Sequence, residues 1–355
     1  MATQLRMKPL RARLLLAFLA ALVAYGASAS FASPGSGELA VVDRTDTDLA
    51  LYKAVASRVG AGESYYEAAV SEHRRRGYPL HPAVTLRLPT LAWIIAATGE
   101  AVASILLHLL ALAAIAGLTV RLNAVAGSKP VWAAATFLIA ASTAILTVPV
   151  MTYWHESWSA LLIALSLALR TEKRWIGSLA LGLLAVLVRE LALPYLCLMG
   201  LLAWKERNHV EAAVWASAGL LFLALLAAHA AALSALATDA DLASPGWSSG
   251  GGWPFVLAML HRMTLLAILP PPFAALLVPL ALLGWAGMGG GLGSRGALLL
   301  LGYVAGFMLF GRPDNFYWGI MIAPLLPLGL AFAPLALCDL ARAARPASAT
   351  SFAPV

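Results

Sequence analysis

The sequence has little charge: Asp, Glu, Lys and Arg make up only 12% of its 355 residues, whereas a soluble domain carries about 25%. Hydrophobic residues make up 61%, and the mean hydropathy is +0.83. This composition excludes a soluble globular domain. Apolar runs near the roughly 20 residues needed to cross a bilayer recur along the chain, and lipid offers their backbone no hydrogen-bond partners. The sequence therefore predicts an all-α, polytopic transmembrane helix bundle.

Cysteine is almost absent, and several catalytic motifs are missing. Cys197 and Cys338 lie in or beside apolar segments, without CxxC or Cys/His spacing. The sequence also lacks GxxxxGK[ST], HExxH and GxSxG, so ATP-driven work, zincin chemistry and serine hydrolysis have no local support. We expect no cofactor and do not favour a divalent metal, because the acidic residues outside the spans form no recognisable ligand set.

We predict about ten spans, which form a single membrane domain of residues 1–355. The apolar run from 175 to 204 is too long for one upright helix and contains Arg189, Glu190 and Pro194, so we divide it at Arg189–Glu190. The predicted spans are at about 14–32, 100–121, 131–151, 157–169, 175–188, 191–204, 211–236, 263–285, 296–311 and 316–337.

The distribution of basic residues predicts the orientation. Four of them, within residues 6–13, precede the first span, and the positive-inside rule then places the N-terminus in the cytoplasm. With ten spans the C-terminus and the other basic loops fall on the same side, so the formal charge of +7 follows from topology and no nucleic-acid partner is expected. These loop and tail residues are Arg121, Lys129, Arg170, Lys173, Arg174, Lys205, Arg207, Arg295, Arg342 and Arg345.

The first apolar segment has two interpretations. It resembles a cleaved signal peptide, because basic residues precede a Leu/Ala core and Ala27-Ser28-Ala29 resembles a cleavage site. We favour a membrane anchor, because the apolar character continues through Ala32 and no charge appears until Glu38. Cleavage would leave the later topology unchanged.

The longest polar segment, residues 33–99, is predicted to be an extracytoplasmic loop of amphipathic and interfacial helices. We expect a helix at about 49–59, a second at about 64–76 that Gly77 ends, and a third at about 86–97. Arg74 to Arg76 and Arg87 either bind lipid phosphates or hold the loop against the headgroups.

Two acidic residues in this loop are candidates for catalysis. Asp46 and Asp48 lie close after the first span, where a carboxylate can act as a general base. They also occupy the N-terminal end of the first predicted loop helix, where an acidic side chain stabilises the helix by about 0.3–1 kcal/mol without any catalysis. Both interpretations stay open at this point.

Three shorter outer loops carry ionisable groups on the same predicted side. Charged residues beside hydrocarbon usually face the protein or a cavity, so Arg189–Glu190 either forms a local ion pair or contributes to a site. Arg312, near Asn315, can bind a phosphate bidentately or belong to an ordinary interfacial loop. His155–Glu156 can contact a phosphate or a sugar, although a single loop histidine often has no such role.

Several of these features together resemble the glycosyltransferase-C superfamily, especially its bacterial polyprenyl-phosphomannose-type mannosyltransferases. They are Asp48-Leu-Ala-Leu-Tyr52, Gly62 with Tyr65-Tyr66, Tyr78-Pro79 before an interfacial helix, and Arg189–Glu190 in an outer turn. The strongest overlap is 46–89, and the remainder matches in topology. The family often has Tyr-Pro-Pro, whereas here Leu80-His81 separates Pro79 from Pro82.

The resemblance implies an inverting glycosyltransferase of the bacterial inner membrane that takes part in building the cell envelope. It would move a sugar from a polyprenyl-phosphate carrier to a hydroxyl of a glycan, lipid or protein on the extracytoplasmic face, and membrane lipids would surround it. Asp48 would be the general base, with Asp46 as its substitute, and Arg189 and Arg312 would stabilise the phosphate leaving group. The other residues implied in substrate binding are Tyr78, His81, His155, Glu156, Glu190 and Asn315.

Two other functions remain open from the sequence. One is a transporter or flippase for a lipid-linked glycan; such proteins often show paired broken helices in two related halves, and the second half of this chain has no counterpart of the 33–99 loop. The other is a noncatalytic membrane assembly subunit.

Overall fold

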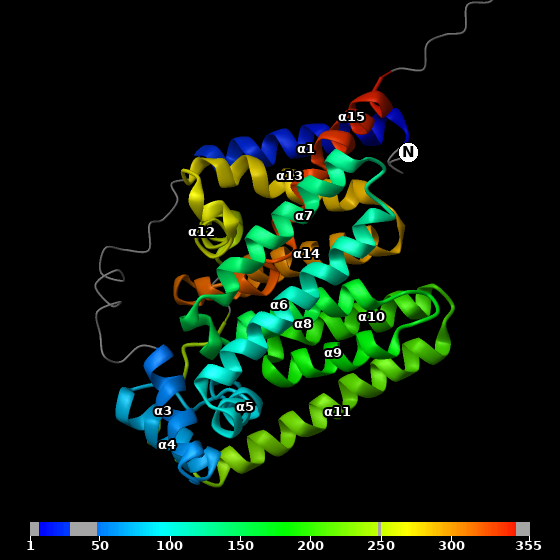
Figure 1. Cartoon of the computed structure of the whole chain (residues 1–355). Coiled ribbons are helices and arrows are strands. Elements are labelled where there is room, and N and C mark those ends of the chain that lie inside the picture. The colour runs from blue at the N-terminus through cyan, green and yellow to red at the C-terminus, as the bar shows by residue number, and fades with distance from the viewer. Residues whose placement is uncertain (1–6, 29–47, 248–249, 346–355) are drawn as a thin grey trace, which may run out of the picture.

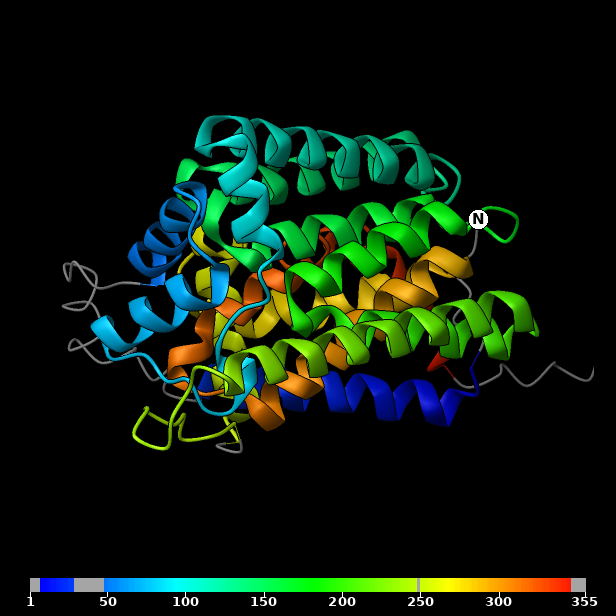
Figure 2. The same cartoon turned by 90° about the horizontal axis from the view of Figure 1, so that it is seen from below.

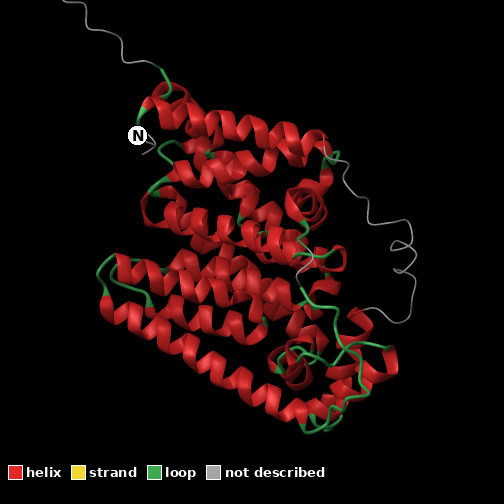
Figure 3. Ribbon diagram, turned by 180° about the vertical axis from the view of Figure 1, so that it is seen from behind, coloured by secondary structure: helices red, strands yellow, loops and turns green. Residues whose placement is uncertain are grey.

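The protein is described by a computed structural model over residues 7–28, 48–247 and 250–345. Within these ranges it consists of helices, turns and loops, with no β-strand (Figure 3). The predicted all-α class is therefore confirmed. In the part of the chain that the structure describes, five segments are long and apolar enough to cross a membrane and indicate an integral membrane protein; the count of ten spans stays a prediction. These segments are α1 (Pro9–Ser28), α6 (Glu100–Asn123), α7 with the turn that follows it (Lys129–Thr147), α11 (His209–Ser234) and α14 (Gly290–Phe310).

Shorter apolar helices lie beside these long ones, and many of the helix axes run along one common direction (Figure 2). Helix α8 is the most deeply packed, since 13 of its 15 residues are buried, and it lies against α6 and α9. Its first residues therefore enter the protein interior at one end of the bundle. The shorter helices are α8 (His155–Leu169), α9 (Ile176–Val188), α10 (Leu193–Lys205), α12 (Gly252–Met263), α13 (Pro272–Met288) and α15 (Ala333–Ala343).

The two ends of the bundle differ. Helices α3 (Asp48–Gly60), α4 (Tyr65–Arg76) and α5 (Thr90–Thr98) gather at one end, at the lower left of Figure 1. The start of α1 and the end of α15 meet at the other end, where Arg13 Nε donates to the carbonyl oxygen of Ala344 at 2.8 Å. Both described termini therefore lie at one end, while its assignment to the cytoplasm stays a prediction.

The first two helices expected in the polar loop form where the local sequence predicts them, whereas the third, expected at about 86–97, begins only at Thr90, after Pro89. The helices expected at 49–59 and 64–76 are α3 and α4, within one residue at each end. Gly77 ends α4 in the left-handed conformation, with φ of 70°, and its N–H bonds back to the last turn. A residue without a Cβ adopts this conformation at little cost.

The apolar run from 175 to 204 divides where we predicted. Helix α9 ends at Val188, a 3₁₀ turn covers Glu190–Ala192, and α10 begins at Leu193. Pro194 occupies the first turn of α10, where a missing N–H costs nothing. Arg189 therefore lies at the break between two short helices.

The prediction of one helix over 316–337 is wrong. The segment forms two 3₁₀ stretches, η7 (Pro313–Ile322) and η8 (Leu326–Ala331), before α15. Prolines recur through it, and each one removes a backbone donor and crowds the preceding turn. Apolar composition alone cannot show this change of backbone geometry. The prolines are Pro313, Pro324, Pro327 and Pro334.

The 3₁₀ stretch η8 packs directly on α13 through two glycines. A Cβ on Gly284 would lie 1.8 Å from the carbonyl oxygen of Gly329, and a Cβ on Gly329 would lie 2.1 Å from that of Ala281. The two backbones are therefore too close to admit any side chain at either position.

We predict that Gly284→Ala destabilises the protein by about 1–3 kcal/mol or more, because the new methyl group must push the η8 backbone away. The matched control is Gly302→Ala in α14, where nothing lies within 4 Å of the added carbon. Unfolding of both variants in detergent, followed by circular dichroism, measures the difference. Equal midpoints for the two variants would show that this contact is not tight.

Candidate functional site

A cavity of about 520 Å³ lies at the end of the bundle that carries α3 and α4. Ligand sites typically measure about 300–1,000 Å³. Five segments distant in sequence form its wall: α3, the stretch 73–87, the α9–α10 break, residues 244–247 and the start of η7. Its polar and aromatic residues include Asp48, Tyr52, His73, Tyr78, Arg87, Arg189, Glu190, Trp247, Arg312, Asp314, Asn315, Tyr317 and Trp318.

Six of the predicted site residues line this cavity. Asp48, Arg189 and Arg312, which are far apart in sequence, share it. The other three are Tyr78, Glu190 and Asn315. Asp46 lies outside the described residues.

The remaining three predicted residues do not line the cavity. His155 is 4% exposed and packs edge-on against Tyr52, with ring centroids 4.9 Å apart. Glu156 is 1% exposed and holds Arg189 from behind. His81 contacts the carbonyl oxygen of Thr238 through Nε2 at 3.0 Å and so connects two loops. Their positions suit support of the site rather than contact with a ligand.

Arg189 is the most enclosed charge of the site. Its side chain is 2% exposed, its Nε donates to Glu156 Oε1 at 2.5 Å, and its Nη1 bonds to Glu190. A buried guanidinium needs such partners, because removing it from water costs several kcal/mol. Glu156 comes from the start of α8 and Glu190 from the α9–α10 break, so the network joins both elements.

Arg87 belongs to the same network, which the sequence did not reveal. Its Nη1 lies 3.5 Å from Glu190 Oε1, and its Nη2 donates to the Tyr317 hydroxyl at 3.2 Å. From the sequence, Arg87 belongs with Arg74 to Arg76, which either bind lipid phosphates or hold the loop against the headgroups. The available signal was its position between Leu86 and Leu88, both of which are buried.

The arginines at 74–76 pair with protein carboxylates. Arg74 bonds to Asp241 at 2.7 Å, and Glu72 accepts hydrogen bonds from Arg58, Arg75 and Arg76. Burial favours the protonated form of Glu72, but the three guanidiniums outweigh it and lower its pKa to about 2. Arg74 therefore joins α4 to the segment at 236–241, whereas the pairs of Arg75 and Arg76 with Glu72 lie within α4 itself.

Asp48 and two tyrosines form the opposite wall. Asp48 is the first residue of α3, and Tyr52 follows one turn later. Burial and then the nearby Asp48 carboxylate raise the pKa of Tyr78, so its phenol stays protonated and can donate. Within the described ranges, no salt bridge joins Asp48 to a basic side chain.

Three buried polar atoms at the cavity have no hydrogen-bond partner among the described residues. They are Arg87 Nε, Asn315 Oδ1 and Trp318 Nε1. More than nine in ten buried polar groups in proteins are satisfied. Two unpaired donors and one unpaired acceptor on residues that line the same cavity are suited to a ligand rich in hydroxyl or phosphate oxygens.

The described residues contain no group of three or more His, Cys, Asp or Glu side chains that could hold a metal ion. No family model, curated protein or solved structure matches the chain at a significant level. The resemblance to the glycosyltransferase-C superfamily thus stays a hypothesis that rests on the residues themselves.

We predict that Glu156→Gln destabilises the protein by about 3 kcal/mol, because it removes one partner of a buried charge. Asp314→Asn is the control, since the Asp314 side chain is 58% exposed and an exposed pair contributes about 0–1 kcal/mol. The free energy of unfolding in detergent is the measurement. A similar small change for both variants would show that Glu156 does not stabilise Arg189.

We also predict that His73 makes the stability of the protein depend on pH. Its side chain is 5% exposed, and its Nδ1 donates to the Ala69 carbonyl oxygen at 2.7 Å. Burial lowers its pKa to about 4, whereas the unfolded chain titrates near 6.5. The unfolded state therefore binds more protons as the pH falls from about 6.5 to 4, and stability drops by on the order of 3 kcal/mol.

The measurement is the unfolding free energy of wild type and His73→Gln across this pH window. The variant lacks the titrating group, so its stability should fall less steeply with decreasing pH. If the free energy of unfolding falls equally with decreasing pH in wild type and variant, the prediction is wrong.

Proposed function

We propose that the protein is a membrane glycosyltransferase that moves a sugar from a polyprenyl-phosphate carrier to an acceptor hydroxyl. The observation that carries this proposal is the convergence of the Asp48 carboxylate with the guanidiniums of Arg87, Arg189 and Arg312 on one cavity. A carboxylate facing cationic groups across a ligand-sized space suits a reaction with a hydroxyl nucleophile and a phosphate leaving group.

The proposed reaction is one in-line displacement. The acceptor oxygen attacks the anomeric carbon, the bond from that carbon to the phosphate oxygen breaks, and Asp48 takes the hydroxyl proton. The carrier phosphate leaves with the electron pair of the broken bond. One displacement inverts the configuration at the anomeric carbon.

The arginines divide between holding the site and binding the phosphate. Arg189 already has two carboxylate partners in the interior, so we assign it to the framework. Arg312 pairs with the exposed Asp314, at 2.7 Å from Nη2 to Oδ2. An exposed pair contributes little, so a phosphate can replace Asp314. Arg87 offers its unpaired Nε from the other side.

The direct test is an in vitro transfer assay with purified protein and a panel of polyprenyl-phosphate sugars. The proposal expects transfer from at least one donor, with inverted stereochemistry in the product. Uptake or translocation of a lipid-linked glycan across a vesicle without any new glycosidic bond would identify a transporter instead.

We predict that Asp48→Asn lowers the transfer rate by about 10²- to 10⁴-fold, which is the usual contribution of a general base. The amide keeps the size of the side chain and loses its basicity. Glu67→Gln in α4 is the control, because this exposed acid does not line the cavity. A fully active Asp48→Asn variant would remove Asp48 from its proposed role.

A further inference from the structure

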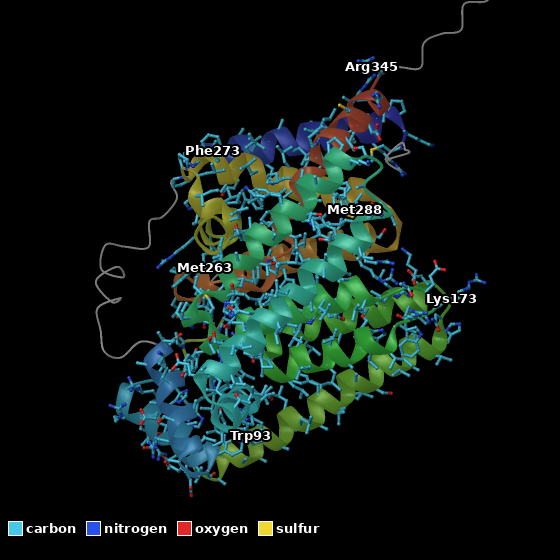
Figure 4. All side chains as sticks on the ribbon, in the orientation of Figure 1. Trp93, Lys173, Met263, Phe273, Met288 and Arg345 are labelled. Carbon is cyan, nitrogen blue, oxygen red and sulfur yellow. The ribbon has the colours of Figure 1, made fainter. Side chains whose placement is uncertain are left out.

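A second cavity, of about 700 Å³, lies at the opposite end of the bundle. Four segments line it: the end of α6, the end of α8 with the turn at 171–174, Glu206 after α10, and the N-terminus of α14. Lys173 projects at this end of the molecule, whereas Trp93 of α5 lies at the end of the first cavity (Figure 4). The two cavities are therefore separate sites.

The wall of the second cavity has a surplus of positive charge. Five basic residues line it, and the only acids among its lining residues are Glu172 and Glu206. Glu206 serves two guanidiniums, at 2.8 Å from Arg170 and 2.6 Å from Arg295. Glu211 does not line the cavity but also pairs with Arg170. Glu172, Glu206 and Glu211 together supply three negative charges against five positive ones. The basic residues are Arg121, Arg170, Lys173, Arg174 and Arg295.

Several of these cations have donors without an acceptor. Arg121 Nε and Arg295 Nε are buried and have no hydrogen-bond partner in the described part of the chain. Arg295 is only 2% exposed. Lys173 and Arg174 form no salt bridge within the described ranges. Topology requires basic residues on one side of the membrane, but it does not require buried, unpaired donors on two residues that line the same cavity.

The N-terminus of α14 adds a second, independent feature. Gly291 and Leu292, in the first turn of this 21-residue helix, line the cavity. The first N–H groups of a helix have no partner within it, and the helix dipole favours an anion there. A Cβ on Gly291 would lie 3.2 Å from Arg295 Nη1, so the absence of a side chain leaves the backbone close to the guanidinium.

We propose that this cavity is an anion site that binds a phosphate group. Guanidinium forks and helix N-termini both match phosphate oxygens, and the cavity combines the two. The phosphate belongs either to the headgroup of an anionic lipid or to a soluble phosphate compound. The site is independent of the transfer chemistry proposed for the first cavity.

The experiment has two arms on full-length purified protein. Calorimetry with inorganic phosphate and with pyrophosphate tests soluble ligands. For the second arm, the protein is extracted from nanodiscs of phosphatidylcholine, with or without phosphatidylglycerol. Native mass spectrometry then tests whether it retains the anionic lipid. We expect binding in one arm, and the arm that responds identifies the source of the phosphate.

The test variant is Arg121→Gln with Arg174→Gln, because neither arginine pairs with a carboxylate among the residues that the structure describes. We expect it to weaken binding by about tenfold or more, as for loss of a charge-assisted hydrogen bond. Arg342→Gln in α15 is the control; it removes a charge outside the cavity, where Arg342 pairs with Asp339. Binding in neither arm, unchanged binding by the double variant, or an equal loss in the control would overturn the proposal.

Discussion

The structure depends on how Arg189 is accommodated inside an apolar bundle. A guanidinium near hydrocarbon is costly unless it has partners, and here Glu156 and Glu190 supply them. The break between α9 and α10 brings Glu190 to the guanidinium, and the deep burial of α8 brings Glu156. Arg87 then reaches Glu190 and Tyr317, so that the polar loop, the helix break and η7 are joined through one set of charges.

This arrangement separates fixed charges from exchangeable ones. The Arg189 pairs are enclosed, so breaking one would leave a charge unsolvated. The Arg312–Asp314 pair is partly open to solvent, with side-chain exposures of 14% and 58%, and water or a ligand can replace the carboxylate at small cost. Arginine therefore stabilises the framework at position 189, whereas at position 312 it pairs with a carboxylate that a ligand can replace. The difference follows from the burial of the paired carboxylate.

Local features could be predicted from the sequence, and long-range ones could not. Helices α3 and α4, the glycine that ends α4 and the break at Arg189 depend on neighbouring residues, and all three are as expected. The 3₁₀ course of 313–331 was missed because hydropathy does not distinguish backbone geometries. Arg87 and His73 were missed as cavity residues because their burial depends on segments far away in the chain, such as Glu190 for Arg87.

The distribution of arginines also distinguishes among the carboxylates that line the first cavity. Glu190 faces Arg87 and Arg189, and Asp314 faces Arg312, so guanidiniums already engage the oxygens of both. A carboxylate held in this way already accepts hydrogen bonds from a cation, and a charge-assisted pair of this kind is stronger than a neutral one. Asp48 lines the same space, and no arginine or lysine in the described ranges forms a salt bridge with it. Its position at the first turn of α3 fixes the carboxylate at the cavity wall without engaging it with a cation. Among the described acids that line this cavity, Asp48 is therefore the one that no guanidinium engages.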